Sequence, residues 1–122
     1  MMEPNSIIKN VVEFLWERPD DGHQDGAYSK MLVTPDTTGS RYFDYRISCY
    51  QPKAQVAPHR HRIQEQIYHV LDGEGLMEID GRRQVVRRHD VVFIAPGSEH
   101  ALYNTGLTDL TFIVVTSPPV DR

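Results

Sequence analysis

Cysteine is nearly absent from this sequence, since Cys49 is the only one among 122 residues. An intramolecular disulfide and a cysteine-based zinc cluster are therefore both excluded. The first ten residues lack the basic and apolar regions of a signal peptide. No apolar run approaches the roughly 18 residues of a membrane span. We therefore expect a cytoplasmic protein with no membrane partner.

Positive charge is also in short supply. Lys and Arg number 13 against 17 Asp and Glu, which gives a formal net charge of −4. This acidic balance disfavours nucleic acid as a partner. Arg82, Arg83, Arg87 and Arg88 form a local basic run, but charged residues commonly protect an exposed strand from pairing with another chain. The length and the 39% hydrophobic content suit a single domain, 1–122.

Long helical periodicities are missing, and short β-prone runs take their place. They recur between turn signals at 11–15, 27–33, 41–50, 66–71, 76–79, 83–88, 91–94 and 110–116. Asp80-Gly81 is the strongest short hairpin signal, and the Pro-, Asp- and Gly-rich segment 17–26 is typical of a loop. Many short strands at nearly regular spacing predict an all-β sandwich or barrel with little helix.

Histidine, by contrast, is well represented, with six residues. His59 and His61 stand one residue apart, and on a strand they would project to the same face and grip one ion with two imidazoles. Glu65 and Gln66 follow side by side. Because adjacent strand residues point to opposite faces, only one of these two can join the histidines from an extended strand.

Two longer stretches carry a family resemblance. HRHRIQEQIYHVLDGEG (59–75), followed by DVVFIAPGSEHALYN (90–104), resembles the two motifs of the cupins. The resemblance implies a double-stranded β-helix of the jelly-roll type, with a barrel core at about 41–117. It also implies a homodimer, with strands in 11–33 at the interface. Where the cupin motifs usually begin with glycine, this chain has Lys53 and His89.

The same resemblance implies a metal site. Six residues separate Gln66 from Gly73, as they separate the cupin ligand from its turn glycine. The implied ligand set is His59, His61, Gln66 and His100. A β-bulge would shift the register and bring in Glu65 instead. Four neutral ligands leave the ion its full +2 charge, which favours an anionic ligand. Nitrogen and oxygen donors without sulfur accept Zn²⁺, Ni²⁺, Mn²⁺, Co²⁺ or Fe²⁺, and we expect one such ion per chain.

Three further residues are candidates for a role in catalysis. Arg46 shares an alternating strand face with Asp44, and it would bind a substrate carboxylate in a fork if this face lines the barrel mouth. A solvated strand face is the alternative. Tyr68 and Tyr103 would serve as acids or hydrogen-bond donors to a substrate, and packing aromatics are the alternative there.

The metal set is similar to that of a cupin of pectin degradation that acts on unsaturated uronates. This resemblance implies isomerase or lyase chemistry on a small anionic substrate, either a sugar acid or a keto/enol carboxylate. Two alternatives remain open at this point. One is an Fe²⁺-dependent dioxygenase, and the other is a cupin that binds a small ligand without turnover. The scaffold alone does not decide between them, because function depends on the site.

Overall fold

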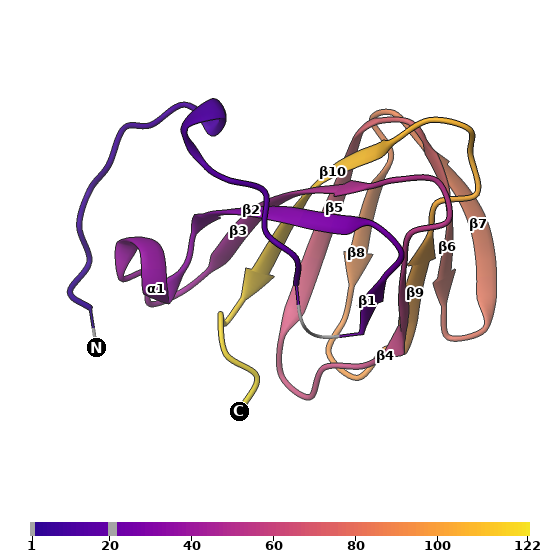
Figure 1. The fold of residues 1–122 in the computed structure, drawn as a ribbon. Coiled ribbons are helices and arrows are strands. Elements are labelled where there is room, and N and C mark those ends of the chain that lie inside the picture. The colour runs from indigo at the N-terminus through magenta and orange to yellow at the C-terminus, as the bar shows by residue number, and fades with distance from the viewer. Residues whose placement is uncertain (1, 20–21) are drawn as a thin grey trace.

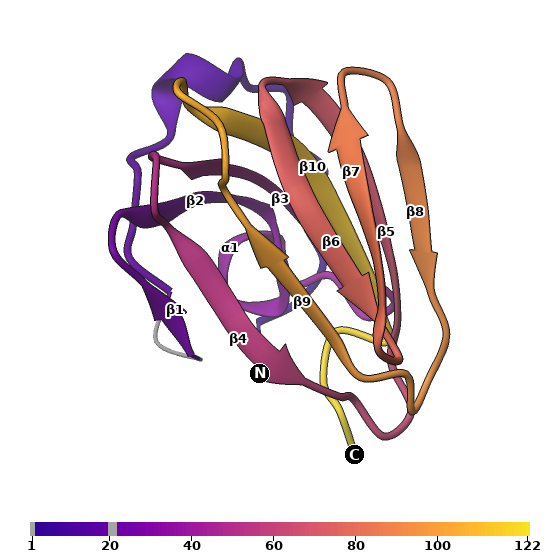
Figure 2. The same ribbon diagram turned by 90° about the vertical axis from the view of Figure 1, so that its right-hand side faces the viewer.

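The protein is built from two five-stranded antiparallel sheets, which a computed structural model describes for residues 2–19 and 22–122. The first sheet contains, in spatial order, β2 (Ala27–Val33), β3 (Asp44–Tyr50), β10 (Leu110–Ser117), β5 (Glu65–Asp72) and β8 (Val91–Ile94). The second contains β1 (His23–Gln24), β4 (Gln55–His59), β9 (His100–Tyr103), β6 (Glu74–Ile79) and β7 (Arg82–Arg87). Figure 2 shows the two sheets packed face to face, so the predicted all-β jelly roll is confirmed.

Helical structure in the described residues is limited to two short turns. The 3₁₀ turn η1 spans Val11–Glu13, and the single α-helical turn α1 spans Pro35–Thr38. The described chain up to and including η1 lies outside the two sheets, on the side of α1 (Figure 1), and Glu17 then forms an isolated bridge with Ser29 of β2. None of the described helices is long and apolar enough to cross a membrane.

The predicted strand at 11–15 is wrong, and its N-cap explains why. Asn10 accepts a hydrogen bond from the backbone N–H of Val12, while Glu13 accepts one from the backbone N–H of Asn10. This capping box favours a helical turn over an extended strand. The predicted β-prone runs do not include β1, β4 or β9, although His59 was considered on a strand; β1 has only two residues, and β4 contains Pro58.

The turns bear out the hairpin signal and explain two unusual residues. Asp80 and Gly81 join β6 to β7 with φ of 49° and 79°, as a type I′ turn requires. Lys53 and His89 stand where cupin motifs usually have glycine, and both adopt left-handed φ values, 78° and 71°. The chain therefore keeps the turn conformations without the glycines, at a cost of roughly 1–2 kcal/mol each.

The core lies between the sheets and forms the floor of a pocket. Tyr50, Tyr68 and Phe112 belong both to the buried apolar cluster and to the pocket wall. The rings of Tyr50 and Phe112 pack edge to face with centroids 5.0 Å apart, a favourable aromatic geometry. The floor of the pocket is therefore part of the packed apolar core.

Strand β3 turns its more polar face inward. Asp44 and Ser48 are buried and line the pocket, and by alternation Tyr45 and Ile47 point outward. The sequence left open whether the face with Arg46 lines the barrel mouth or is solvated, and in the structure Arg46 lines the pocket. The outer face of this sheet is correspondingly apolar.

Candidate metal centre

Three histidines gather at one end of the second sheet. His59 ends β4 and His100 begins β9, where the two residues are direct cross-strand partners. His61 lies beyond the end of β4, in the loop to β5, so strand alternation is not what brings it beside His59. One ligand atom from each of the three imidazoles lies within 4.8 Å of the others. This clustering supports a metal site.

Backbone carbonyls orient two of the imidazoles. The Nδ1 atom of His59 lies 2.7 Å from the carbonyl oxygen of Ala57, and that of His100 lies 3.0 Å from the carbonyl oxygen of Ser98. A carbonyl accepts only from a protonated Nδ1, which leaves Nε2 as the lone-pair atom. Such outer contacts fix the tautomer and ring orientation of metal-binding histidines.

Gln66 points into the same pocket, and its neighbour does not. Gln66 is buried and lines the pocket, whereas Glu65 is exposed on the other face of β5. The Gln66 amide donates a hydrogen bond from Nε2 to Thr116 Oγ1 at 3.0 Å. This contact leaves Oε1 as the atom available to an ion.

Two buried polar atoms make the strongest case for an ion. Gln66 Oε1 and His100 Nε2 are fully buried and accept no hydrogen bond within the described residues. Leaving such atoms unsatisfied costs about 1–3 kcal/mol each, and a divalent cation would satisfy both. The residues present therefore fit a bound transition metal, which His59, His61, Gln66 and His100 would hold.

Burial also sets the protonation state of His100. Its side chain is almost completely buried, and desolvation lowers its pKa to about 4, against a smaller opposing effect of the hydrogen bond to Ser98. The neighbouring His59 and His61 lower the pKa further. His100 is therefore neutral near pH 7, the form that coordinates a metal.

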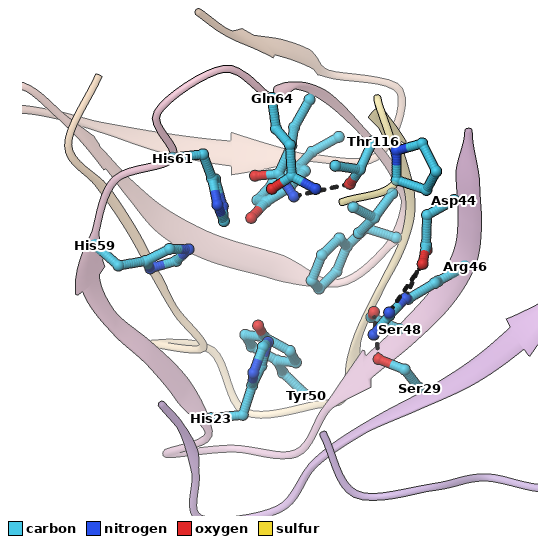
Figure 3. Close-up of a pocket in the computed structure, with 15 residues that line it drawn as sticks. His23, Ser29, Asp44, Arg46, Ser48, Tyr50, His59, His61, Gln64 and Thr116 are labelled. Atoms are coloured by element: carbon cyan, nitrogen blue, oxygen red, sulfur yellow. Dashed lines mark hydrogen bonds and ion pairs between the residues drawn. The ribbon is translucent and has the colours of Figure 1, made fainter. Parts of the chain in front are cut away.

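Polar side chains occupy the wall across from the histidines, as Figure 3 shows. Asp44 accepts two hydrogen bonds from Arg46, at 2.6 Å from Nε and 2.9 Å from Nη2. Beside this pair the hydroxyls of Ser29 and Ser48 lie 2.8 Å apart. The cavity measures about 180 Å³, below the roughly 300–1,000 Å³ of sites for drug-sized ligands. It therefore suits a ligand of few atoms.

The structure brings only two of the three candidate catalytic residues to the pocket. Arg46 and Tyr68 line it, and the Tyr68 ring packs edge-on to His100 with centroids 6.4 Å apart. Tyr103 is not among the lining residues. It lies three residues after His100 on β9, so alternation turns it to the opposite face of the sheet.

Several pocket-lining residues were not predicted from the sequence, among them His23 and Gln64. His23, in a segment predicted to be loop, lines the pocket from β1 (Figure 3). Gln64 lies two residues before Gln66 and lines the pocket as Gln66 does. The spacing of two was a usable signal for Gln64. His23 carried none, because β1 is too short to show a pattern.

The fold and the site together define a small double-stranded β-helix with a three-histidine pocket. The family model described as "Cupin domain" matches residues 46–116, more than half of the chain. The chain therefore belongs to the cupin family.

Similar proteins share this architecture. An oxalate-binding protein of Thermotoga maritima is 38% identical over 64 residues, which cover 52% of this chain and 53% of that protein. The chain thus spans about half the length of the curated relatives that it matches first. The structure of a predicted oxalate decarboxylase from Thermotoga maritima superposes with a TM-score of 0.82 at 26% identity, covering 91% of this chain and 98% of the other. KdgF from Halomonas sp. superposes with a TM-score of 0.78 at 20% identity, covering 96% of each chain.

Proposed function

We propose that this cupin holds one divalent transition metal through His59, His61, Gln66 and His100, and acts on a small carboxylate by isomerase or lyase chemistry. The observation that carries the proposal is the pair of buried acceptor atoms, Gln66 Oε1 and His100 Nε2, beside two further imidazoles. The metal would supply a Lewis acid that polarises a substrate oxygen. The four ligands carry no charge, so the site would attract an anion.

The chain's own residues orient the substrate in this proposal. Asp44 takes two N–H groups of Arg46, so the pair presents a fixed guanidinium with little net charge. We therefore expect Arg46 to orient a polar group of the substrate, while net attraction comes from the metal. Tyr68 lines the same pocket with its ring edge-on to that of His100, and it would donate a hydrogen bond or a proton to the substrate.

A second candidate is a binding protein without turnover. It is favoured by the 38% identity to an oxalate-binding protein over half of the chain, and the small cavity suits a ligand of the size of oxalate. Oxalate is therefore the first probe. Titration of metal-loaded and metal-free protein with oxalate should show saturable binding only when the metal is present. Binding that is equal without metal would overturn the proposed function.

Turnover separates the two candidates. The metal-loaded protein would be incubated with unsaturated uronates and with oxalate, and products followed by nuclear magnetic resonance. Metal-dependent product formation that is lost in His59→Ala supports the enzyme. Saturable binding of a carboxylate without any product supports the binding protein.

We also infer that two copies of the chain pair through the outer face of the sheet β2-β3-β10-β5-β8. Two cross-strand rows of mainly apolar side chains run over this face. One row is Ile47, Ile113, His69 and Val91, and the other is Tyr45, Val115, Ile67 and Phe93. Phe93 is 57% exposed and Val91 is 63% exposed, so the rows are not covered within the chain.

The segment before β1 offers a matching apolar surface. Ile8, Val12 and Leu15 are among the exposed side chains of residues 2–19, and the chain up to η1 lies outside the two sheets (Figure 1). One chain therefore presents both an apolar face and an apolar arm. A second copy can bury each of them against its own surfaces, which is why we infer a homodimer rather than a different partner.

A further inference from the structure

The segment that follows β10 turns back to the loop between β4 and β5. There the carboxylate of Asp121 accepts three backbone hydrogen bonds. The N–H of Arg62 lies 2.7 Å from Oδ2, and those of Ile63 and Gln64 lie 2.7 Å and 3.2 Å from Oδ1. Three successive N–H groups that converge on one carboxylate form a compact anion-binding turn. Asp121 thus ties two segments almost 60 residues apart in sequence.

The loop that Asp121 holds lies between proposed ligands. Residues 60–64 join His59 at the end of β4 to the start of β5, so the loop carries His61 itself and leads into Gln66. On its other side the loop is held by a hydrogen bond from the N–H of Gly97 to the carbonyl oxygen of His61, 2.7 Å long. The loop is therefore fixed from two sides by contacts that are distant in sequence.

The same segment forms part of the pocket wall. Gln64 donates a hydrogen bond from Nε2 to the carbonyl oxygen of Pro118 at 3.0 Å, and both Gln64 and Pro119 line the pocket. Ser117 donates from its hydroxyl to the carbonyl oxygen of Tyr42. The segment 117–121 is thus anchored at its two ends and closes one side of the cavity.

We propose that Asp121 is a positioning residue for the metal centre. By fixing the backbone of 62–64, it keeps His61 and Gln66 turned toward His59 and His100 before an ion arrives. It also holds the segment 117–121 against the pocket, which slows exchange of the ion with solvent. This role rests on the proposed function, because it presumes that the four residues bind a metal.

Replacing Asp121 should change the affinity for the metal more than the free energy of unfolding. Asp121 is exposed, and so are its hydrogen bonds to the N–H groups of Arg62 and Ile63, so water can replace most of what a substitution removes and the folded state loses little stability. The loop, however, gains conformations that do not present His61 and Gln66 together. Loss of an outer contact that orients ligands typically costs 10–100-fold in metal affinity.

The test uses Zn²⁺ as the probe, with Asp121→Ala, Asp121→Asn and the control Asp90→Ala. Asp90 also accepts a backbone hydrogen bond, from Arg87 at 2.7 Å, but it lies in the turn between β7 and β8. The dissociation constant would be measured by competition with a chromophoric chelator, and the release rate by mixing loaded protein with excess chelator. Thermal unfolding of the metal-free proteins would be followed alongside.

Asp121→Ala should weaken Zn²⁺ binding about 10–100-fold and speed its release, with Asp121→Asn in between and Asp90→Ala unchanged. Unchanged affinity and release rate in Asp121→Ala would overturn the role of Asp121 alone, even if the metal-free protein unfolds at a lower temperature. A wild-type protein that binds no Zn²⁺, Ni²⁺, Mn²⁺, Co²⁺ or Fe²⁺ would overturn the proposed function and, with it, this role.

Discussion

Among single residues, Gln66 has the largest effect on the charge of the proposed centre. Its amide oxygen is turned inward and buried, while the carboxylate of Glu65 is turned to solvent. An amide leaves the ion at +2, and a carboxylate in its place would leave +1. A carboxylate at this position would therefore increase the affinity for the metal, whereas the amide leaves more positive charge to attract an anion.

We expect His59→Ala, His100→Ala and Gln66→Ala to lose most of the metal, and Glu65→Ala to keep it. Each of the first three variants removes a donor, whereas Glu65 points away from the pocket. Inductively coupled plasma mass spectrometry on protein purified without added metal measures the metal content per chain. Metal that is retained in Gln66→Ala and lost in Glu65→Ala would show that the carboxylate is the ligand.

Gln66→Glu should bind the metal more tightly and a carboxylate ligand less tightly. The added negative charge stabilises the ion but reduces its attraction for an anion. Chelator competition measures the first effect and titration with oxalate the second. An increase in both affinities would contradict the charge argument.

The metal-free protein should lose stability as the pH falls from about 6.5 toward 4. Burial lowers the pKa of His100 from 6.5 to about 4 in the folded state, so below 6.5 the unfolded chain binds a proton that the folded chain does not. Protonation therefore favours unfolding, by about 2–3 kcal/mol at pH 4.5. Urea unfolding of the wild type and of His100→Asn at pH 7.5 and 4.5 measures how much unfolding free energy each protein loses on acidification. The variant should lose less stability on acidification, and equal losses would contradict the prediction.

The strands could be predicted from local sequence patterns more completely than the site. Strands β2 and β8 could be predicted residue for residue, because turn signals bound each run on both sides. The site could be predicted less fully. The cupin resemblance implies Gln66 through its spacing to Gly73, but the place of His61 depends on a loop held by Asp121, a contact across almost 60 residues that no local pattern encodes.

Two turn glycines should differ sharply in their tolerance of a methyl group. Gly73 joins β5 to β6 with φ of 87°, and a Cβ there would lie 2.3 Å from the carbonyl oxygen of Asp109. Gly81 has φ of 79° but an added Cβ would meet nothing within 4 Å. Gly81→Ala should therefore cost only the left-handed strain of roughly 1–2 kcal/mol. Gly73→Ala adds a backbone clash.

We expect Gly73→Ala to be less stable than Gly81→Ala by about 1–3 kcal/mol, the usual cost of overpacking. Denaturant unfolding of both variants measures the difference. Equal stability would mean that the turn after β5 moves aside at no cost.

At the scale of the whole molecule, the apolar rows on the outer sheet face should control assembly. Ile67→Lys places a charge in the middle of one row, and we expect it to convert a homodimer into monomers. Val85→Lys is the control, since Val85 is similarly exposed but lies on β7 of the other sheet. Sedimentation velocity measures the mass of each. A wild-type protein that sediments as a monomer would contradict the proposed pairing.

The inward-facing polar residues of β3 also affect which strand register forms during folding. A shift of one residue in strand register exchanges the two faces of a strand, and in β3 such a shift would bury Tyr45 and Ile47 and expose Asp44 and Ser48. The polarity of these four residues alone therefore favours the shifted register. The native register is held by the contact of Tyr50 with Phe112 and by the bond between Ser29 and Ser48. Pairing of two chains would then stabilise the native register over the shifted one, because only the native register presents the apolar rows for a partner to cover.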